Sequence, residues 1–162
     1  KKYDDSFSSN GADRVEFKLS VNPGQPLRPL VKIASGGELS RVMLAIQTIL
    51  TTDTVETLIF DEVDTGISGS VAETVGKKLA HLGKRRQTLC ITHLPQIAAF
   101  AEHHYAVTKS TENDQTYTFI KDLDKQQAIT EIARLLDGSE ITNQALKLAR
   151  EMRKRSHSTT AN

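Results

Sequence analysis

Apolar and polar residues follow one another along this chain in patterns that are typical of alternating strands and helices. Over residues 14–21 the two kinds alternate strictly, which predicts a half-buried strand with one wet face. After Gly36 the apolar residues recur at three- and four-residue steps, which predicts an amphipathic helix. These residues are Leu39, Val42, Met43, Ile46, Ile49 and Leu50. Ser35 and Glu38 have the spacing of a capping box, so the helix is expected to begin there.

Two short apolar runs predict strands that are buried on both faces, as in a parallel sheet: residues 57–60 and 87–92. Further strands are predicted at residues 105–108 and 116–120, around a polar turn. Helices are predicted at residues 70–82, 94–101, 128–136 and 143–155. This alternation predicts an α/β fold with a mainly parallel sheet and flanking helices.

Length and composition limit the organisation of the chain. Its 162 residues suit a single domain, and 38% hydrophobic with 25% charged residues leaves a polar surface that suits contact with other chains. The formal charge of +1 excludes a uniformly basic clamp and an acidic tail. One cysteine, Cys90, excludes a disulfide framework and a multi-cysteine zinc site. We see neither an apolar run that reaches the ~18 residues of a membrane span nor a secretory leader.

The predicted helix start at Ser35 is the first candidate for chemistry. Gly36 and Gly37 leave backbone amides uncovered at a helix N-terminus, and such a mouth binds phosphate. The alternative is a plain helix cap. The paired glycines weaken that alternative, because each costs about 1 kcal/mol in a helix relative to alanine.

The ends of the two predicted buried strands are the other candidates. Asp61 and Glu62 follow the first strand and repel each other, so they favour a nearby cation or a shared proton. In phosphoryl transfer one acid commonly holds Mg²⁺ while a second group orients the attacking water. His93 follows the second strand, where an imidazole can touch a phosphate oxygen. For Asp61 and Glu62 taken alone, the alternative is an exposed loop with ordinary acids. For His93 taken alone, it is an ordinary loop histidine.

Taken together, these motifs resemble those of the ABC-type ATPase superfamily. Residues 35–38 resemble the signature motif, and residues 58–62 resemble the Walker B strand with its catalytic glutamate. Asp64 lies in a stretch similar to the D-loop, and His93 is similar to the switch histidine. Within the superfamily the chain is most similar to the RecN family, which are bacterial SMC-like proteins of DNA double-strand-break repair. The stretches that carry this similarity are residues 11–17, 22–26, 34–41, 59–69, 92–96 and 133–140.

The sequence departs from the superfamily in one respect, because it contains no Gly-x-x-x-x-Gly-Lys-[Ser/Thr] phosphate loop. The resemblance therefore implies the C-terminal lobe of an ATPase head without its Walker A strand. It implies a lead-in from the coiled-coil side at residues 1–10, the lobe at 11–155 and a tail at 156–162. In this superfamily the Walker A strand lies between the strands expected at 87–92 and 105–108. We therefore expect an empty slot there, self-association of the lone lobe, and no ATP hydrolysis by it.

The resemblance also implies a role for each residue. Asp61 would help hold Mg²⁺, Glu62 would polarise the hydrolytic water, and His93 would contact the γ-phosphate of ATP. The resemblance also implies contacts to the ATP of a second head, made by Ser35, Gly36, Gly37 and Glu38. It implies that Asp64 lies beside the interface between the two heads. The implied partners are the N-terminal lobe of the same protein, a second head in a homodimer and DNA, in the bacterial cytoplasm at the nucleoid and without a membrane.

Three other interpretations stay open or are disfavoured. The head lobe of another SMC-like chromosome protein is close, although residues 22–26 and 64–69 favour RecN. A non-enzymatic interaction module can use the same scaffold. A transporter subunit is disfavoured, because transporters usually carry Gln where Glu38 stands.

Basic residues form two clusters, which are weaker candidates for DNA contact. A solvated helix face is the ordinary explanation for each, and the near-zero net charge gives no overall phosphate footprint. The clusters are Lys77, Lys78, Lys84, Arg85 and Arg86, and Lys147, Arg150, Arg153, Lys154 and Arg155.

Overall fold

The computed structural model describes residues 11, 15–20, 24–32, 35–50, 55–112 and 114–160. Helices and strands alternate over most of this length. The strands are β1 (Lys18–Leu19), β2 (Arg28–Pro29), β3 (Thr57–Phe60), β4 (Gln87–Cys90), β5 (His104–Glu112) and β6 (Gln115–Leu123). The helices are the 3-10 turn η1 (Leu30–Lys32), α1 (Gly36–Ile49), α2 (Gly69–Gly83), α3 (Pro95–Ala98), α4 (Lys125–Asp137) and α5 (Asn143–Thr160).

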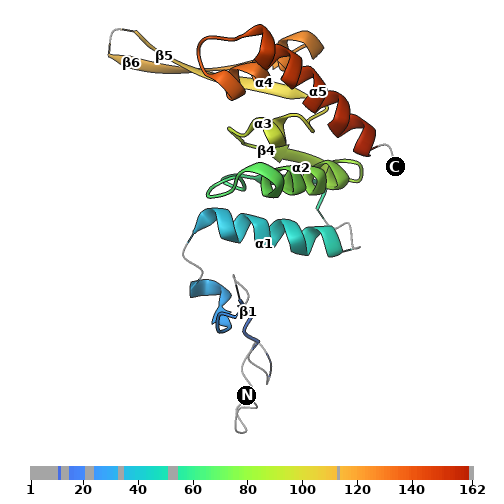
Figure 1. The fold of residues 1–162 in the computed structure, drawn as a ribbon. Coiled ribbons are helices and arrows are strands. Elements are labelled where there is room, and N and C mark those ends of the chain that lie inside the picture. Colours follow the sequence, from blue (N-terminus) through green and yellow to red (C-terminus); the bar gives the residue numbers. More distant parts are fainter. Residues whose placement is uncertain are drawn as a thin grey trace.

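The elements are stacked in successive tiers, with α1 next to α2 and β4, and then α4 and α5 beside the β5–β6 hairpin (Figure 1). Each described sheet has two strands: β3–β4 is parallel, and β1–β2 and β5–β6 are antiparallel. The predicted α/β class with flanking helices is confirmed. Parallel pairing is confined to β3 and β4 in the described chain, because β5 pairs antiparallel with β6.

Two clusters of buried residues hold the tiers together. One lies between α1, α2 and the parallel strands and consists of Leu44, Phe60, Val63, Ala72, Val75, Leu79, Leu82 and Ile97. The other joins α3, α4 and α5 and consists of Ala98, Ala99, Ile132, Ala133, Ala145 and Ala149. Its alanines let the helix backbones approach closely, so this tier is packed by small residues.

The boundaries of α4 show how local chemistry places a helix. Asp124 and Gln127 form a complete capping box at its start. Gly138 ends it with a φ of 85°, a left-handed conformation that glycine adopts without strain, and its amide donates to Arg134 O at 2.8 Å. The break predicted at Gly138 is therefore confirmed.

The buried face of α1 differs from the apolar stripe in its sequence. The helix forms where the periodicity predicts it, but Leu39, Met43, Ile46, Ile49 and Leu50 are all exposed. Its buried residues are Gly37 and Leu44, and the latter joins the cluster with α2. The periodicity thus identifies an apolar face that nothing covers in the described chain.

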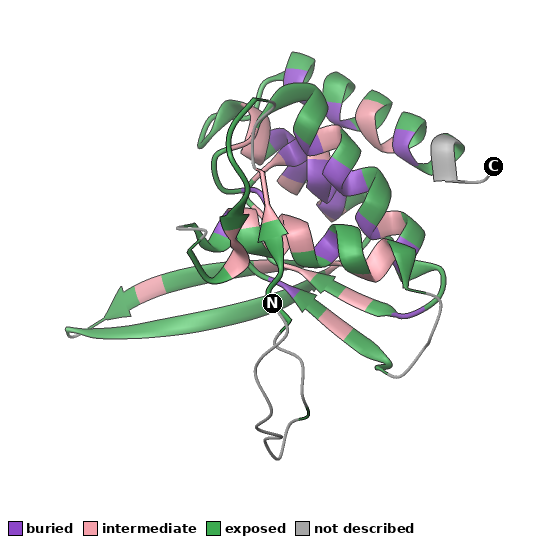
Figure 2. Cartoon of the chain, turned by 90° about the horizontal axis from the view of Figure 1, so that it is seen from below, coloured by how far each residue is buried: buried purple, intermediate pink, exposed green. Residues whose placement is uncertain are grey.

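The parallel strands are also open on one face. Phe60 is 3% exposed beneath the helices, whereas Ile59 is 69% and Ile91 is 61% exposed on the other side. Buried residues are concentrated on the helices, and the strands are mainly exposed or intermediate (Figure 2). The prediction that both strands are buried on both faces is wrong, because only one side of the pair has a covering layer among the described residues.

The strand predicted at residues 14–21 lies partly outside the described residues. Within them only Lys18–Leu19 forms a ladder with β2. Val15 is 77% and Phe17 is 71% exposed, so the predicted burial of this face is wrong there. Separately, no described helix is both long and apolar enough to span a bilayer.

The contrast between buried Phe60 and exposed Ile59 leads to a prediction about stability. Phe60→Ala should lower the free energy of unfolding by about 3–5 kcal/mol, because it empties a packed core site. Ile59→Ala, one residue earlier on the exposed face, should cost less than about 1 kcal/mol. Urea unfolding of both variants measures the difference, and equal losses would show that the outer face of β3 is covered.

Candidate functional site

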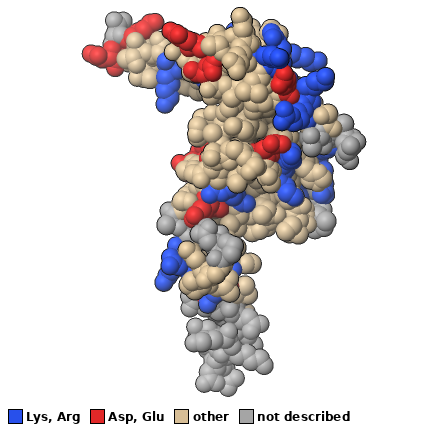
Figure 3. Space-filling model, in the orientation of Figure 1, with Lys and Arg blue, Asp and Glu red and all other residues tan. Residues whose placement is uncertain are grey.

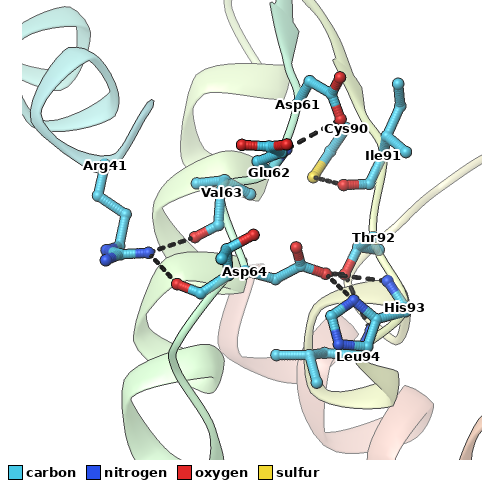
Figure 4. Close-up of polar contacts among 11 residues, drawn as sticks. Arg41, Asp61, Glu62, Val63, Asp64, Cys90, Ile91, Thr92, His93 and Leu94 are labelled. Carbon is cyan, nitrogen blue, oxygen red and sulfur yellow. Dashed lines mark hydrogen bonds and ion pairs between the residues drawn. The ribbon is translucent and has the colours of Figure 1, made fainter. Parts of the chain in front are cut away.

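The carboxyl ends of β3 and β4 bring the sequence-predicted acids and histidine to one edge. Phe60 and Cys90 are partners in the parallel register, and the Ile91 amide donates to Phe60 O at 3.0 Å. The residues that follow these strands therefore lie side by side: Asp61 and Glu62 on one, and Thr92 and His93 on the other (Figure 4). Ligands of open α/β sheets bind at this edge.

Asp64 is the centre of the polar contacts at this edge. It is only 4% exposed, and its Oδ2 accepts from Thr92 Oγ1 at 2.7 Å and from the His93 amide at 2.9 Å. The same oxygen lies 3.0 Å from His93 Nδ1. Burial alone would raise the pKa of Asp64. Hydrogen bonds from Thr92 and His93, with the charge of His93, outweigh that and lower the pKa below its ordinary value.

His93 is held at one nitrogen and open at the other side of its ring. The side chain is 73% exposed while Nδ1 faces the Asp64 carboxylate. A carboxylate at Nδ1 favours the proton there, which leaves Nε2 to accept a hydrogen bond, or to donate one when the ring is protonated. The arrangement orients an imidazole toward solvent at the strand ends.

Glu62 has an unusual backbone conformation next to the start of α1. Its φ is 57°, a left-handed conformation that costs a non-glycine residue about 1 kcal/mol, and its amide donates to Asp61 Oδ1 at 2.9 Å. A Cβ at Gly36 would collide with the Glu62 carboxylate. Glu62 therefore lies at the helix N-terminus, where the helix dipole favours a negative charge.

The first two turns of α1 are tied to the loop that carries Asp64. A Cβ at Gly37 would lie 2.8 Å from Glu62 O and 2.9 Å from Thr65 Cβ, so only glycine fits this approach. Ser40 Oγ donates to Asp61 O at 2.7 Å. Arg41 Nη1 donates to Val63 O at 3.1 Å and to Thr65 O at 2.8 Å, the carbonyls on either side of Asp64.

Sequence reasoning gave no role to Ser40, Arg41 or Thr92, although all three organise this edge. The sequence did not indicate that Arg41 binds backbone carbonyls, because Glu38 three residues before it offers an ordinary ion pair as an explanation for this arginine. Ser35 behaves as predicted, since its Oγ accepts from the Glu38 amide at 3.1 Å and caps α1.

Asp61 fits Mg²⁺ only as one ligand among several. Its side chain is exposed at the strand end, and the described residues contain no group of three or more His, Cys, Asp or Glu side chains that could hold a metal. Mg²⁺ commonly binds one or two carboxylates and completes its shell with phosphates and water, which matches a single aspartate here. Nearby, burial and the charges of Asp64 and Asp61 raise the pKa of Cys90 to about 12, so its thiol is a poor nucleophile.

Three bacterial proteins are similar to most of this chain. It is 54% identical over 144 residues to a protein of Vibrio cholerae, which covers 88% of this chain and 26% of the relative. It is 46% identical over 147 residues to one of Halalkalibacterium halodurans and 43% identical over 148 residues to one of Streptomyces coelicolor. These two matches cover 90% and 91% of this chain and 26% of each relative.

All three relatives are bacterial DNA repair proteins. Each is named DNA repair protein RecN, which confirms the predicted resemblance to that family over most of this chain. The chain spans about a quarter of the length of these relatives.

No family model matches the chain. One solved structure, described as concerning ATP-driven dimerisation and DNA-stimulated activation of SMC ATPases, is 20% identical with a TM-score of 0.44. That match covers 72% of this chain and 70% of the solved one.

Proposed function

We propose that this chain is the C-terminal lobe of the ATPase head of a RecN-type protein that acts in DNA double-strand-break repair and recombination. The observation that supports it best is the shared edge after β3 and β4, where Asp61 and Glu62 follow one strand and His93, held by the buried Asp64, follows the other. The similar proteins are bacterial DNA repair proteins, which supports our proposal that the chain acts in the bacterial cytoplasm at the nucleoid. The proposed lobe extends over residues 11–155.

Each residue at the edge has a proposed role that its surroundings suit. Glu62 accepts a proton from the attacking water, and His93, fixed through Nδ1, presents Nε2 to a terminal phosphate oxygen. Asp61 contributes one carboxylate to Mg²⁺, which when bound neutralises phosphate charge. Asp64 fixes the orientation of His93 and the loop between the strands.

The start of α1 is the proposed contact with a second head. Ser35, Gly36, Gly37 and Glu38 present a capped helix N-terminus, which suits the phosphates of a nucleotide bound by the partner. In the present structure Glu62 of the same chain lies beside Gly36, so its carboxylate must move before an anion can approach this mouth.

Exposed apolar faces support a further lobe as the partner within the head. The stripe on α1 and the outer face of β3 and β4 present Leu39, Ile49, Ile59, Leu89 and Ile91 to solvent. A protein normally covers such faces, because each square ångström of apolar surface removed from water stabilises by about 25 cal/mol. Since the chain spans about a quarter of its relatives' length, an N-terminal lobe of the same protein is the proposed cover.

Reassembly tests the proposal directly. The chain alone should hydrolyse ATP no faster than the buffer control, and co-purification with the N-terminal lobe of its RecN-type protein should restore magnesium-dependent turnover. The physical reason is that the chain has no phosphate loop to grip the β- and γ-phosphates. Phosphate release from each lobe and from the mixture is the measurement. Robust turnover by the chain alone, or none from a stable complex, would contradict the proposal.

A further inference from the structure

Charge is distributed unevenly along this chain, although the total is +1. Residues 69–86 and 143–160, which contain α2 and α5, hold ten basic and two acidic residues and so carry +8. The remaining 11 basic and 18 acidic residues carry −7. The small net charge therefore conceals a strongly polarised molecule.

The two basic segments are neighbours in the fold. Helix α5 packs against α2, and Lys and Arg side chains gather on that side of the molecule, over α5 and down to α2 (Figure 3). Separate basic stretches of sequence thus form one surface, which we call the α2–α5 basic surface. Its exposed members are Lys77, Lys78, Lys84, Arg85, Lys147, Arg150, Lys154 and Arg155.

Some cations on this side are engaged within the chain. Lys77 lies 2.8 Å from Glu73, and this hydrogen bond, the charge of Lys77 and that of Arg155 lower the pKa of Glu73. Arg86 is 7% exposed and donates to Gln47 Oε1 at 3.0 Å, so it belongs to the packing of α1. Arg153 is half-buried.

Three exposed cations on α5 have no such partner in the described chain: Lys147, Arg150 and Lys154. Their spacing of three and four residues places them on one stripe, opposite the face that buries Ala145 and Ala149. The stripe is about 10 Å long, and a strand of B-DNA presents about three phosphates over that length. The spacing of the free charges therefore suits successive phosphates.

The α2–α5 basic surface is separate from the proposed ATP site. Helix α2 begins five residues after Asp64 and continues for 15 residues, so its C-terminal end with Lys84 and Arg85 lies about 22 Å from its start. The C-terminal ends of α2 and α5 lie at the side of the fold away from the start of α1 (Figure 1). The surface can bind a polyanion without blocking the strand ends.

We propose that the α2–α5 basic surface, with Lys147, Arg150 and Lys154 at its centre, binds the phosphate backbone of DNA without reading its sequence. This inference rests on the proposed function for the choice of polyanion, since an unpaired basic stripe recognises phosphate and a repair protein meets it in DNA. Binding of this kind releases counterions, so its strength falls steeply with salt.

The test uses the RecN-length protein that contains this chain and fluorescein-labelled duplexes of two unrelated sequences. Lys147→Gln/Arg150→Gln/Lys154→Gln should weaken binding to both duplexes equally. It should also reduce the slope of log K against log salt by about 2–3, since each lost phosphate contact contributes roughly 0.9. The matched control Lys109→Gln/Lys121→Gln/Lys125→Gln removes the same charge from exposed positions on the hairpin and the start of α4.

The control variant should bind DNA as the unmodified protein does, and the α5 variant should keep its helix content, because glutamine is a good helix former. ATPase without DNA is measured in parallel, so a failure of the proposed ATPase is separable from a failure of DNA binding. Equal losses in both variants, or an unchanged salt slope in the α5 variant, would overturn the inference.

Discussion

Glu62→Gln in the assembled RecN-length protein should reduce kcat for ATP hydrolysis by about 10²–10⁴-fold, the usual contribution of a general base. Glutamine has nearly the same shape as glutamate, so the close approach between residue 62 and the start of α1 is kept. It cannot accept a proton from water, and it carries no charge at the strand end. ATP binding should persist, because Glu62 acts on the water and not on the phosphates.

Glu56→Gln is the matched control for this experiment. Glu56 is exposed and lies directly before β3, at the opposite end of the same strand, and it should keep full activity. Single-turnover phosphate release and nucleotide binding separate the chemical step from affinity. If Glu62→Gln were as active as Glu56→Gln, the chain would be better explained as an interaction module on an ATPase scaffold.

The second large effect is expected at Asp64. Asp64→Ala removes the acceptor of the Thr92 hydroxyl and the His93 amide, and buried donors without partners cost about 1–3 kcal/mol each. We expect the free energy of unfolding to fall by about 2–4 kcal/mol, measured by urea titration at neutral pH. Asp64→Asn keeps an acceptor oxygen and should recover part of the loss. Asp122→Ala, on the exposed hairpin, should change stability by less than about 0.5 kcal/mol.

The pH dependence of the free energy of unfolding separates the contribution of the Asp64 charge from that of the side chain's shape. Its pKa in the folded chain lies below the ordinary value of 3.8, so the unfolded chain binds the proton first as the pH falls. The contribution of the ionised form is therefore complete above about pH 4 to 5 and is lost below 3.8, as the pH passes through the folded-state value. The stability difference between the native chain and Asp64→Asn should shrink over that range. A difference that stayed constant to pH 2 would show that the charge contributes nothing.

Local sequence signals located most elements of this fold. The strand at 57–60 and the helix after Ser35 occur where their patterns predict them, because caps, turns and apolar spacing act within a few residues. The burial of these elements was not predictable in the same way. Periodicity shows that α1 has an apolar face, but the face that packs depends on Leu44 meeting α2, a contact between distant parts of the chain.

The candidate site shows the same division. The strand-end residues Asp61, Glu62 and His93 were predictable, since the parallel pairing of two apolar runs brings their ends together. Arg41 and Ser40 were not, because each donates to a backbone carbonyl more than twenty residues away. A carbonyl acceptor leaves no mark in the sequence, since every residue has one.

Arg41 connects the beginning of α1 to His93 through a short series of bonds. Its guanidinium holds the carbonyls on both sides of Asp64, and Asp64 in turn holds the amide and Nδ1 of His93. The two side chains in this series, Arg41 and Asp64, are each held by hydrogen bonds at their polar ends, so a rotation of α1 would be transmitted to the imidazole as a displacement of the loop. Binding of another subunit to α1 would therefore change the orientation of the His93 side chain.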